Sequence, residues 1–120
     1  MQATKEQFLA AKCKTRTLPA PELGEGVEIT VVEPDDDAYE ALESADYPIG
    51  PDGRMSLVRK GRAVRWAIAM VRNGDGAPMF TDADGPALAR MPSGLLERIL
   101  MAGLDMTSGR APVEDAAKNS

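Results

Sequence analysis

Apolar and polar residues alternate most regularly near the N-terminal end of this chain. In the run 27–31, Val, Ile and Val alternate with Glu and Thr, and this period of two predicts a strand with one buried face. The earlier run 15–19 ends in proline, which excludes a central strand and leaves the edge of a sheet. Between the two runs, the loop Leu23–Gly26 contains two glycines that permit the positive φ angles of a tight turn. The pattern therefore predicts an N-terminal β-hairpin.

Two short helices are predicted around this hairpin. The first covers about Lys5–Ala11, because Thr4 can cap it and the glutamine three residues later completes a capping box. The second starts at Asp35 or Asp36, either of which can cap it, and extends to about Glu43. Its acidic residues lie at the positive end of the helix dipole, which favours the same placement.

The middle of the chain allows two interpretations. After a loop at 47–53, which is dense in proline and glycine, apolar residues in the run 56–71 follow the i, i+3, i+4, i+7 spacing of an amphipathic helix. Three arginines on and after this run are expected to point outward: Arg59, Arg62 and Arg72. The run Asn-Gly-Asp-Gly at 73–76 is a strong turn signal, so the alternative is a hairpin with 67–71 as a strand. We favour the helix.

Two further helices are predicted in the last third of the chain. After a short extended segment, Pro78–Phe80, Thr81 can cap a helix from Asp82 to about Ala89. A last helix, from about residue 92 to residue 105, buries a stripe of leucine and isoleucine.

Together the elements predict an α+β fold that is mainly helical, with a small N-terminal β-hairpin and about four helices. Residues 1–109 are expected to form a single domain. Residues 110–120 lack any apolar periodicity and are predicted to be a disordered C-terminal tail.

Composition excludes much of catalytic chemistry. The chain has no histidine, which rules out Ser-His-Asp triads and imidazole-bound metals. It has one cysteine, Cys13; Lys12 and Lys14 could lower the pKa of the thiol, but no base or second thiol accompanies it. The acidic run 35–37 is explained by helix capping. We therefore expect no enzyme, no catalytic residue, no cofactor and no metal site.

Charge is distributed unevenly along the chain, whose net charge is −5. Every charged residue from Leu18 to Gly53 is acidic, and every charged residue from Arg54 to Arg72 is basic. The net negative charge argues against a nucleic-acid partner, so we expect the two blocks to pair within the fold or between copies. No apolar run approaches the roughly 20 residues of a membrane span, and the N-terminal residues lack a signal-peptide core, which predicts a cytosolic protein without a membrane partner.

Several runs resemble one known family. Residues 64–84, Val-Arg-Trp-Ala-Ile-Ala-Met-Val-Arg-Asn-Gly-Asp-Gly-Ala-Pro-Met-Phe-Thr-Asp-Ala-Asp, resemble a segment of the tail assembly chaperones of long-tailed, siphovirus-type bacteriophages and prophages. In that segment an aliphatic run precedes an acidic-glycine turn, a Pro-hydrophobic-Phe segment and a Thr/Ser-Asp helix cap. The run 88–99 resembles the family's leucine-rich last helix, and the run 4–12 resembles its opening. The resemblance covers most of the chain.

The resemblance implies a chaperone-like domain that binds the tape measure protein and brings it to the major tail tube protein without catalysis. It also implies a location in the host cytoplasm and absence from the mature virion. Weak homo-oligomers are expected from the opposed charge blocks and the small core. The alternatives are a structural virion component, such as a head–tail connector or neck protein, and an acidic inhibitor that mimics nucleic acid.

Partner contacts are expected at apolar side chains near the 73–76 turn: Trp66, Met70, Met79 and Phe80. For Trp66, partial exposure and a core position near the edge both remain open.

Overall fold

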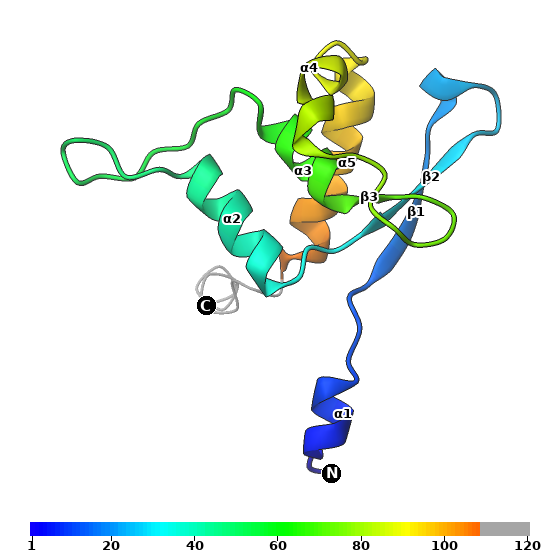
Figure 1. Cartoon of the computed structure of the whole chain (residues 1–120), viewed down its shortest axis with the longest axis vertical. Helices are drawn as coiled ribbons and strands as arrows, with labels where there is room; N and C mark the ends of the chain where they lie inside the picture. Colours follow the sequence, from blue (N-terminus) through cyan, green and yellow to red (C-terminus); the bar gives the residue numbers. More distant parts are fainter. Residues whose placement is uncertain (109–120) are drawn as a thin grey trace, which may run out of the picture.

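The computed structural model describes residues 1–108 and has an α+β architecture that is mainly helical, as predicted (Figure 1). In chain order its elements are α1 (Lys5–Leu9), β1 (Thr15–Pro19), the 3-10 turn η1 (Pro21–Leu23), β2 (Glu28–Val32), α2 (Asp36–Asp46), α3 (Arg62–Met70), β3 (Val71–Arg72), the 3-10 turn η2 (Asp82–Asp84), α4 (Gly85–Leu88) and α5 (Ser93–Met106). The tail predicted at 110–120 lies outside the described residues. No helix in the described part is long and apolar enough to cross a membrane.

The predicted N-terminal hairpin is present and belongs to a three-stranded antiparallel sheet with the order β1-β2-β3. β1 forms one edge of this sheet, which is the position that its terminal proline requires. The connection between the strands is longer than a tight turn: η1 precedes Gly24 and Gly26, whose φ angles are 146° and 74°. Leu18 and Val31 point into the core, so one face of the hairpin is buried.

The central helix is shorter than the apolar spacing predicted. α3 begins at Arg62, because Gly61 at its N-cap has a φ of 75° and cannot lie within a helix. The interpretations of helix and hairpin each hold in part: α3 continues to Met70, and the chain then forms β3 and reverses through the predicted turn at 73–76. The Met79 amide donates to the Val71 carbonyl at 3.1 Å and closes this reversal.

The predicted caps are observed. Thr4 and Gln7 form the capping box of α1, which ends at Leu9, two residues earlier than predicted. Asp35 caps α2, which continues to Asp46, three residues further than predicted. Thr81 forms a capping box with Asp84, but the segment that follows is η2 and a short α4 instead of one continuous helix.

The core lies where α3 packs against α5, and Leu18 and Val31 of the hairpin belong to the same buried cluster (Figure 1). It is aliphatic apart from one indole ring; its buried members are Leu18, Ala20, Val31, Leu42, Trp66, Ala67, Met70, Val71, Leu95, Leu96, Ile99, Leu100, Ala102 and Met106. Tyr39 packs edge-on against Trp66, with ring centroids 6.3 Å apart.

Parts of the chain extend away from this core. Figure 1 shows α1 standing off beyond the start of β1, and the segment 47–61 forming a long excursion between α2 and α3. α1 contains no buried residue. The excursion includes a bridge between Ile49 and Met55, and both of these apolar side chains are about 70% exposed (72% and 68%). The exposed apolar side chains on these extensions are available for contacts with other molecules.

Candidate functional site

A wholly apolar pocket of about 80 Å³ opens between the hairpin and the helices α3, α4 and α5. We call it the apolar pocket. Its lining residues are Leu23, Ile29, Ala67, Val71, Met79, Phe80, Leu88, Met91, Leu95, Leu96 and Ile99. They come from both halves of the chain, so the pocket exists only in the folded molecule.

The lining divides into a closed floor and an accessible mouth. Ala67, Val71 and Ile99 are buried and form the floor. At the mouth, Leu23 is 47% exposed and Met79 is 43% exposed. Methionine and leucine side chains at the mouth can adapt to different apolar partners, because their rotamers change at little cost.

The size of the apolar pocket favours a peptide side chain over a small molecule. Ligand pockets usually measure about 300–1,000 Å³ and carry a few polar groups that orient the ligand. This pocket is far smaller, at about 80 Å³, and its lining is entirely apolar. It can therefore receive one aliphatic side chain but offers no group to orient a cofactor or a substrate.

An ion pair holds the hairpin side of the pocket in place. Arg98 on α5 donates from Nη1 and Nη2 to the two carboxylate oxygens of Glu22, each at 3.0 Å, and from Nη1 to the Pro19 carbonyl at 3.1 Å. The hydrogen bond from Arg98 lowers the pKa of Glu22, and the same bond raises the pKa of Arg98. Since Glu22 adjoins Leu23 in η1, the pair positions one lip of the mouth against α5.

This pair predicts a pH-dependent contribution to stability. The folded-state pKa of Glu22 is depressed, so its contribution is present above the unfolded pKa and is lost as pH falls through the folded value. We expect the difference in unfolding free energy between the native chain and Glu22→Gln to be largest at neutral pH. It should begin to shrink as the pH falls below the ordinary glutamate pKa, about 4.3, and should vanish only below the depressed folded-state pKa, where the Glu22 carboxyl is protonated and uncharged like glutamine.

Urea unfolding of both proteins from pH 7 to pH 3 measures this difference. Glu25→Gln, an exposed change in the same connection between strands, is the matched control and should show little difference at any pH. A difference for Glu22→Gln that stayed constant over the whole range would contradict the prediction.

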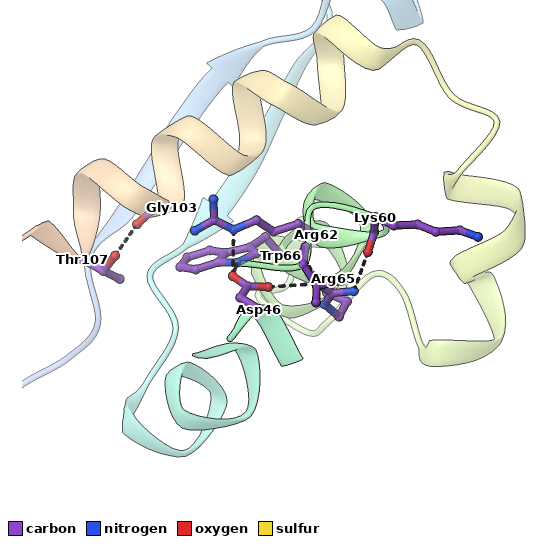
Figure 2. A network of polar contacts seen from close by, with 8 residues as sticks. Asp46, Lys60, Arg62, Arg65, Trp66, Gly103 and Thr107 are labelled. Atoms are coloured by element: carbon purple, nitrogen blue, oxygen red, sulfur yellow. Dashed lines mark hydrogen bonds and ion pairs between the residues drawn. The ribbon is translucent and has the colours of Figure 1, made fainter. Parts of the chain in front are cut away.

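A buried polar network joins the end of α2 to α3 (Figure 2). Asp46, which is 1% exposed, accepts from Arg62 Nε at 2.8 Å and from Trp66 Nε1 at 2.9 Å through Oδ2. Its Oδ1 accepts from Arg65 Nη2 at 3.0 Å. Two cations and an indole N–H therefore satisfy one carboxylate, which fixes the end of α2 against α3.

The same network closes the base of the 47–61 excursion. The Val58 amide donates to the Asp46 carbonyl at 2.7 Å, and Arg65 donates from Nη1 to the Lys60 carbonyl at 3.0 Å (Figure 2). Asp46 belongs to the acidic block and its two arginines to the basic block, so the expected pairing of the blocks occurs within the fold at this point. The prediction that Arg62 points outward is wrong, because this side chain is turned inward to Asp46 and is 15% exposed.

The four expected contact residues separate into two pairs. Met79 and Phe80 line the apolar pocket, and Met79 lies at its mouth. Trp66 and Met70 are 2% and 0% exposed, so the expectation that they are accessible is wrong. Of the two possibilities for Trp66, the structure shows the core position.

Sequence reasoning missed other lining residues, chiefly Leu23 and Met91. Leu23 was assigned only to the loop of the hairpin, and no local spacing relates it to α5. The available signal in the sequence was a single leucine within an otherwise polar, glycine-containing connection.

Cys13 is a free, exposed cysteine in the segment that precedes β1. Partial burial raises the pKa of its thiol, and the carboxylates of Glu33 and Asp35 raise it further, against a smaller opposing effect of Arg72. The flanking lysines therefore do not activate it, and a higher pKa means less reactive thiolate at neutral pH.

Comparison with known proteins relates this chain to a bacteriophage protein. No protein-family model matches the chain, and no curated protein matches it. Among solved structures, it is similar to the tail assembly chaperone of bacteriophage HK97, with a TM-score of 0.57 and 20% sequence identity. The match covers 84% of this chain and 90% of the HK97 protein. The two proteins share a fold.

Proposed function

We propose that this chain is a tail assembly chaperone of a long-tailed bacteriophage or prophage, and that it binds the tape measure protein without catalysis. Two observations support the proposal: the fold shared with the HK97 tail assembly chaperone over most of both chains, and the apolar pocket at the surface. The pocket carries the argument, because a chaperone needs a place for apolar side chains of its client and needs no reactive group.

The geometry suits repeated, reversible binding. A pocket for a single side chain buries much less area than the roughly 800 Å² per partner of a stable interface, so each contact is weak. Weak contacts repeated along an extended helical client give useful total affinity and still allow release. In this proposal the chain delivers the tape measure protein to the major tail tube protein in the host cytoplasm, associates weakly with itself, and is absent from the mature virion.

Met79 provides the direct test. We expect the native chain to co-purify with the tape measure protein of the same phage or prophage, and we expect Met79→Glu to reduce the affinity at least tenfold. A carboxylate at the mouth would have to lose its hydration when the client's apolar side chain enters. Co-expression followed by pull-down, with titration of the purified proteins, measures both.

Met101→Glu is the matched control. Met101 is 54% exposed on α5, compared with 43% for Met79, and it does not line the apolar pocket. This variant should bind as the native chain does. Absence of any tape measure binding, together with the presence of the chain in purified virions, would instead support a structural virion component.

A further inference from the structure

The N-terminal arm, residues 1–14, presents apolar side chains to solvent. On α1, Phe8 is 76% exposed and Leu9 is 72% exposed. The helix is nevertheless defined by a complete capping box: Gln7 N donates to Thr4 Oγ1 at 3.1 Å, and Thr4 N donates to Gln7 Oε1 at 3.0 Å. A five-residue helix is marginal on its own in water, so a capped helix with two exposed apolar residues is suited to dock on a surface.

The arm and the rim of the apolar pocket carry opposite charge. The arm has three lysines, Lys5, Lys12 and Lys14, and a single acidic residue, Glu6. The hairpin connection next to the pocket mouth carries Glu22 and Glu25 and no basic residue, and Glu28 follows as the first residue of β2. Glu22 is paired with Arg98, while Glu25 and Glu28 are exposed. Opposite charges of this kind favour encounter and set the orientation of docking.

The arm points away from the pocket of its own chain. It joins the start of β1 at Thr15, whereas Leu23 and the pocket mouth follow the end of β1 at Pro19. Figure 1 shows α1 beyond one end of the hairpin and the β1–β2 connection at the other. An arm in this arrangement can reach the pocket of a second copy.

We propose that the N-terminal arm of one copy docks in the apolar pocket of a second copy. The aliphatic side chain of Leu9 enters the pocket, and Phe8 lies over its mouth against Leu23 and Met79. The lysines of the arm lie near the glutamates of the hairpin connection.

This contact joins two different surfaces, so every assembly that does not close into a ring keeps a free arm at one end and a free pocket at the other. Such a head-to-tail contact produces rings or open filaments, depending on the angle between neighbours. It is expected to be weak, because a five-residue helix and a pocket of about 80 Å³ form a small interface. If the pocket also binds the client, arm and client compete for it. The docking gives a physical form to the weak self-association of the proposed function, and the competition rests on the client binding proposed there.

The test compares the full-length native chain with two double variants by sedimentation equilibrium over a concentration series. Phe8→Ser with Leu9→Ser removes the apolar face of the arm. Ile49→Ser with Met55→Ser is the matched control, since those residues are 72% and 68% exposed on the 47–61 excursion. We expect concentration-dependent self-association of the native chain and of the control, and association at least tenfold weaker for the arm variant. Raising the salt concentration should weaken it as well.

A second measurement locates the arm. A synthetic peptide of residues 1–14, labelled through its single cysteine, Cys13, should bind the arm variant in fluorescence anisotropy. Adding Met79→Glu to the arm variant should reduce peptide binding at least tenfold, and adding Met101→Glu should leave it unchanged.

Three outcomes would overturn the proposal. One is a native chain that stays monomeric at all concentrations. Another is association that the Ile49/Met55 variant loses and the arm variant keeps. The third is an affinity for the arm peptide that Met79→Glu does not lower. Pull-down of the tape measure protein with the arm variant tests the proposed function separately from the docking. Client binding by this variant supports the proposed function even if the arm does not dock. Loss of self-association in the arm variant supports the docking even if no client binds.

Discussion

Replacing Asp46 with Asn should lower the free energy of unfolding by about 3 kcal/mol, a large part of the roughly 5–15 kcal/mol that stabilises a small domain. The substitution keeps the size of the side chain but removes its charge. Arg62 and Arg65 then lose their carboxylate partner, and the new NH₂ group faces a donor from Arg62, Arg65 or Trp66. Breaking a fully buried pair costs about 3–5 kcal/mol. The lower value applies here because the side chains of Arg62 and Arg65 are 15% and 30% exposed and keep part of their hydration.

Urea unfolding monitored by Trp66 fluorescence and by circular dichroism measures this loss. Glu40→Gln is the matched control, because Glu40 lies on the same helix as Asp46 and is exposed. It should change the unfolding free energy by less than about 0.5 kcal/mol. If Asp46→Asn also changed it by no more than this amount, the network would not stabilise the fold.

Local sequence signals predicted the starts of the first two helices well. Thr4 and Asp35 each cap a helix through a bond to a backbone amide three residues away, and this chemistry is visible in a window of four residues. The hairpin followed from alternation over five residues, and Pro19 correctly placed β1 at an edge. Each of these features depends on neighbours in the sequence, so no knowledge of packing was needed.

Features that depend on distant residues could not be predicted. The apolar spacing across 56–71 continued past the true start of α3, because spacing does not report the left-handed conformation of Gly61. Trp66 is buried because Asp46, twenty residues earlier, accepts its N–H. A helical wheel of α3 contains no information on that partner, and for the same reason it placed Arg62 outward.

Only a small part of the candidate site was predictable, two of its eleven lining residues. Met79 and Phe80 were identified because they are apolar residues that follow a tight turn, which places them near the surface. The rest of the lining requires the docking of the hairpin onto α5, where Leu23 meets residues more than seventy positions later, such as Leu95. The charge blocks indicated pairing, but the sequence left open whether that pairing joins parts of one chain or two chains.

Gly103→Ala should destabilise the fold by about 2 kcal/mol, the middle of the cost of overpacking a filled core. Gly103 lies on α5 where this helix packs against α3. A Cβ atom there would lie 2.5 Å from Cε3 of Trp66 and 2.6 Å from Sδ of Met70. Met70 can change rotamer, but the indole ring is held by its bond to Asp46 and by Tyr39 at its edge. The clash can therefore be relieved only if α3 and α5 move apart. The free-energy cost of that movement exceeds the roughly 1 kcal/mol by which alanine is favoured over glycine within a helix.

Gly94→Ala on the same helix separates packing from helix propensity. A Cβ atom at Gly94 meets nothing closer than the Oε2 atom of Glu22 at 3.8 Å, an ordinary contact. This variant should be as stable as the native chain or up to about 1 kcal/mol more stable. Thermal and urea unfolding of the two variants measure the contrast. If Gly103→Ala and Gly94→Ala stabilised the chain equally, α3 and α5 would accommodate a methyl group at their contact without cost. The close approach at Gly103 would then not hold Trp66 in place.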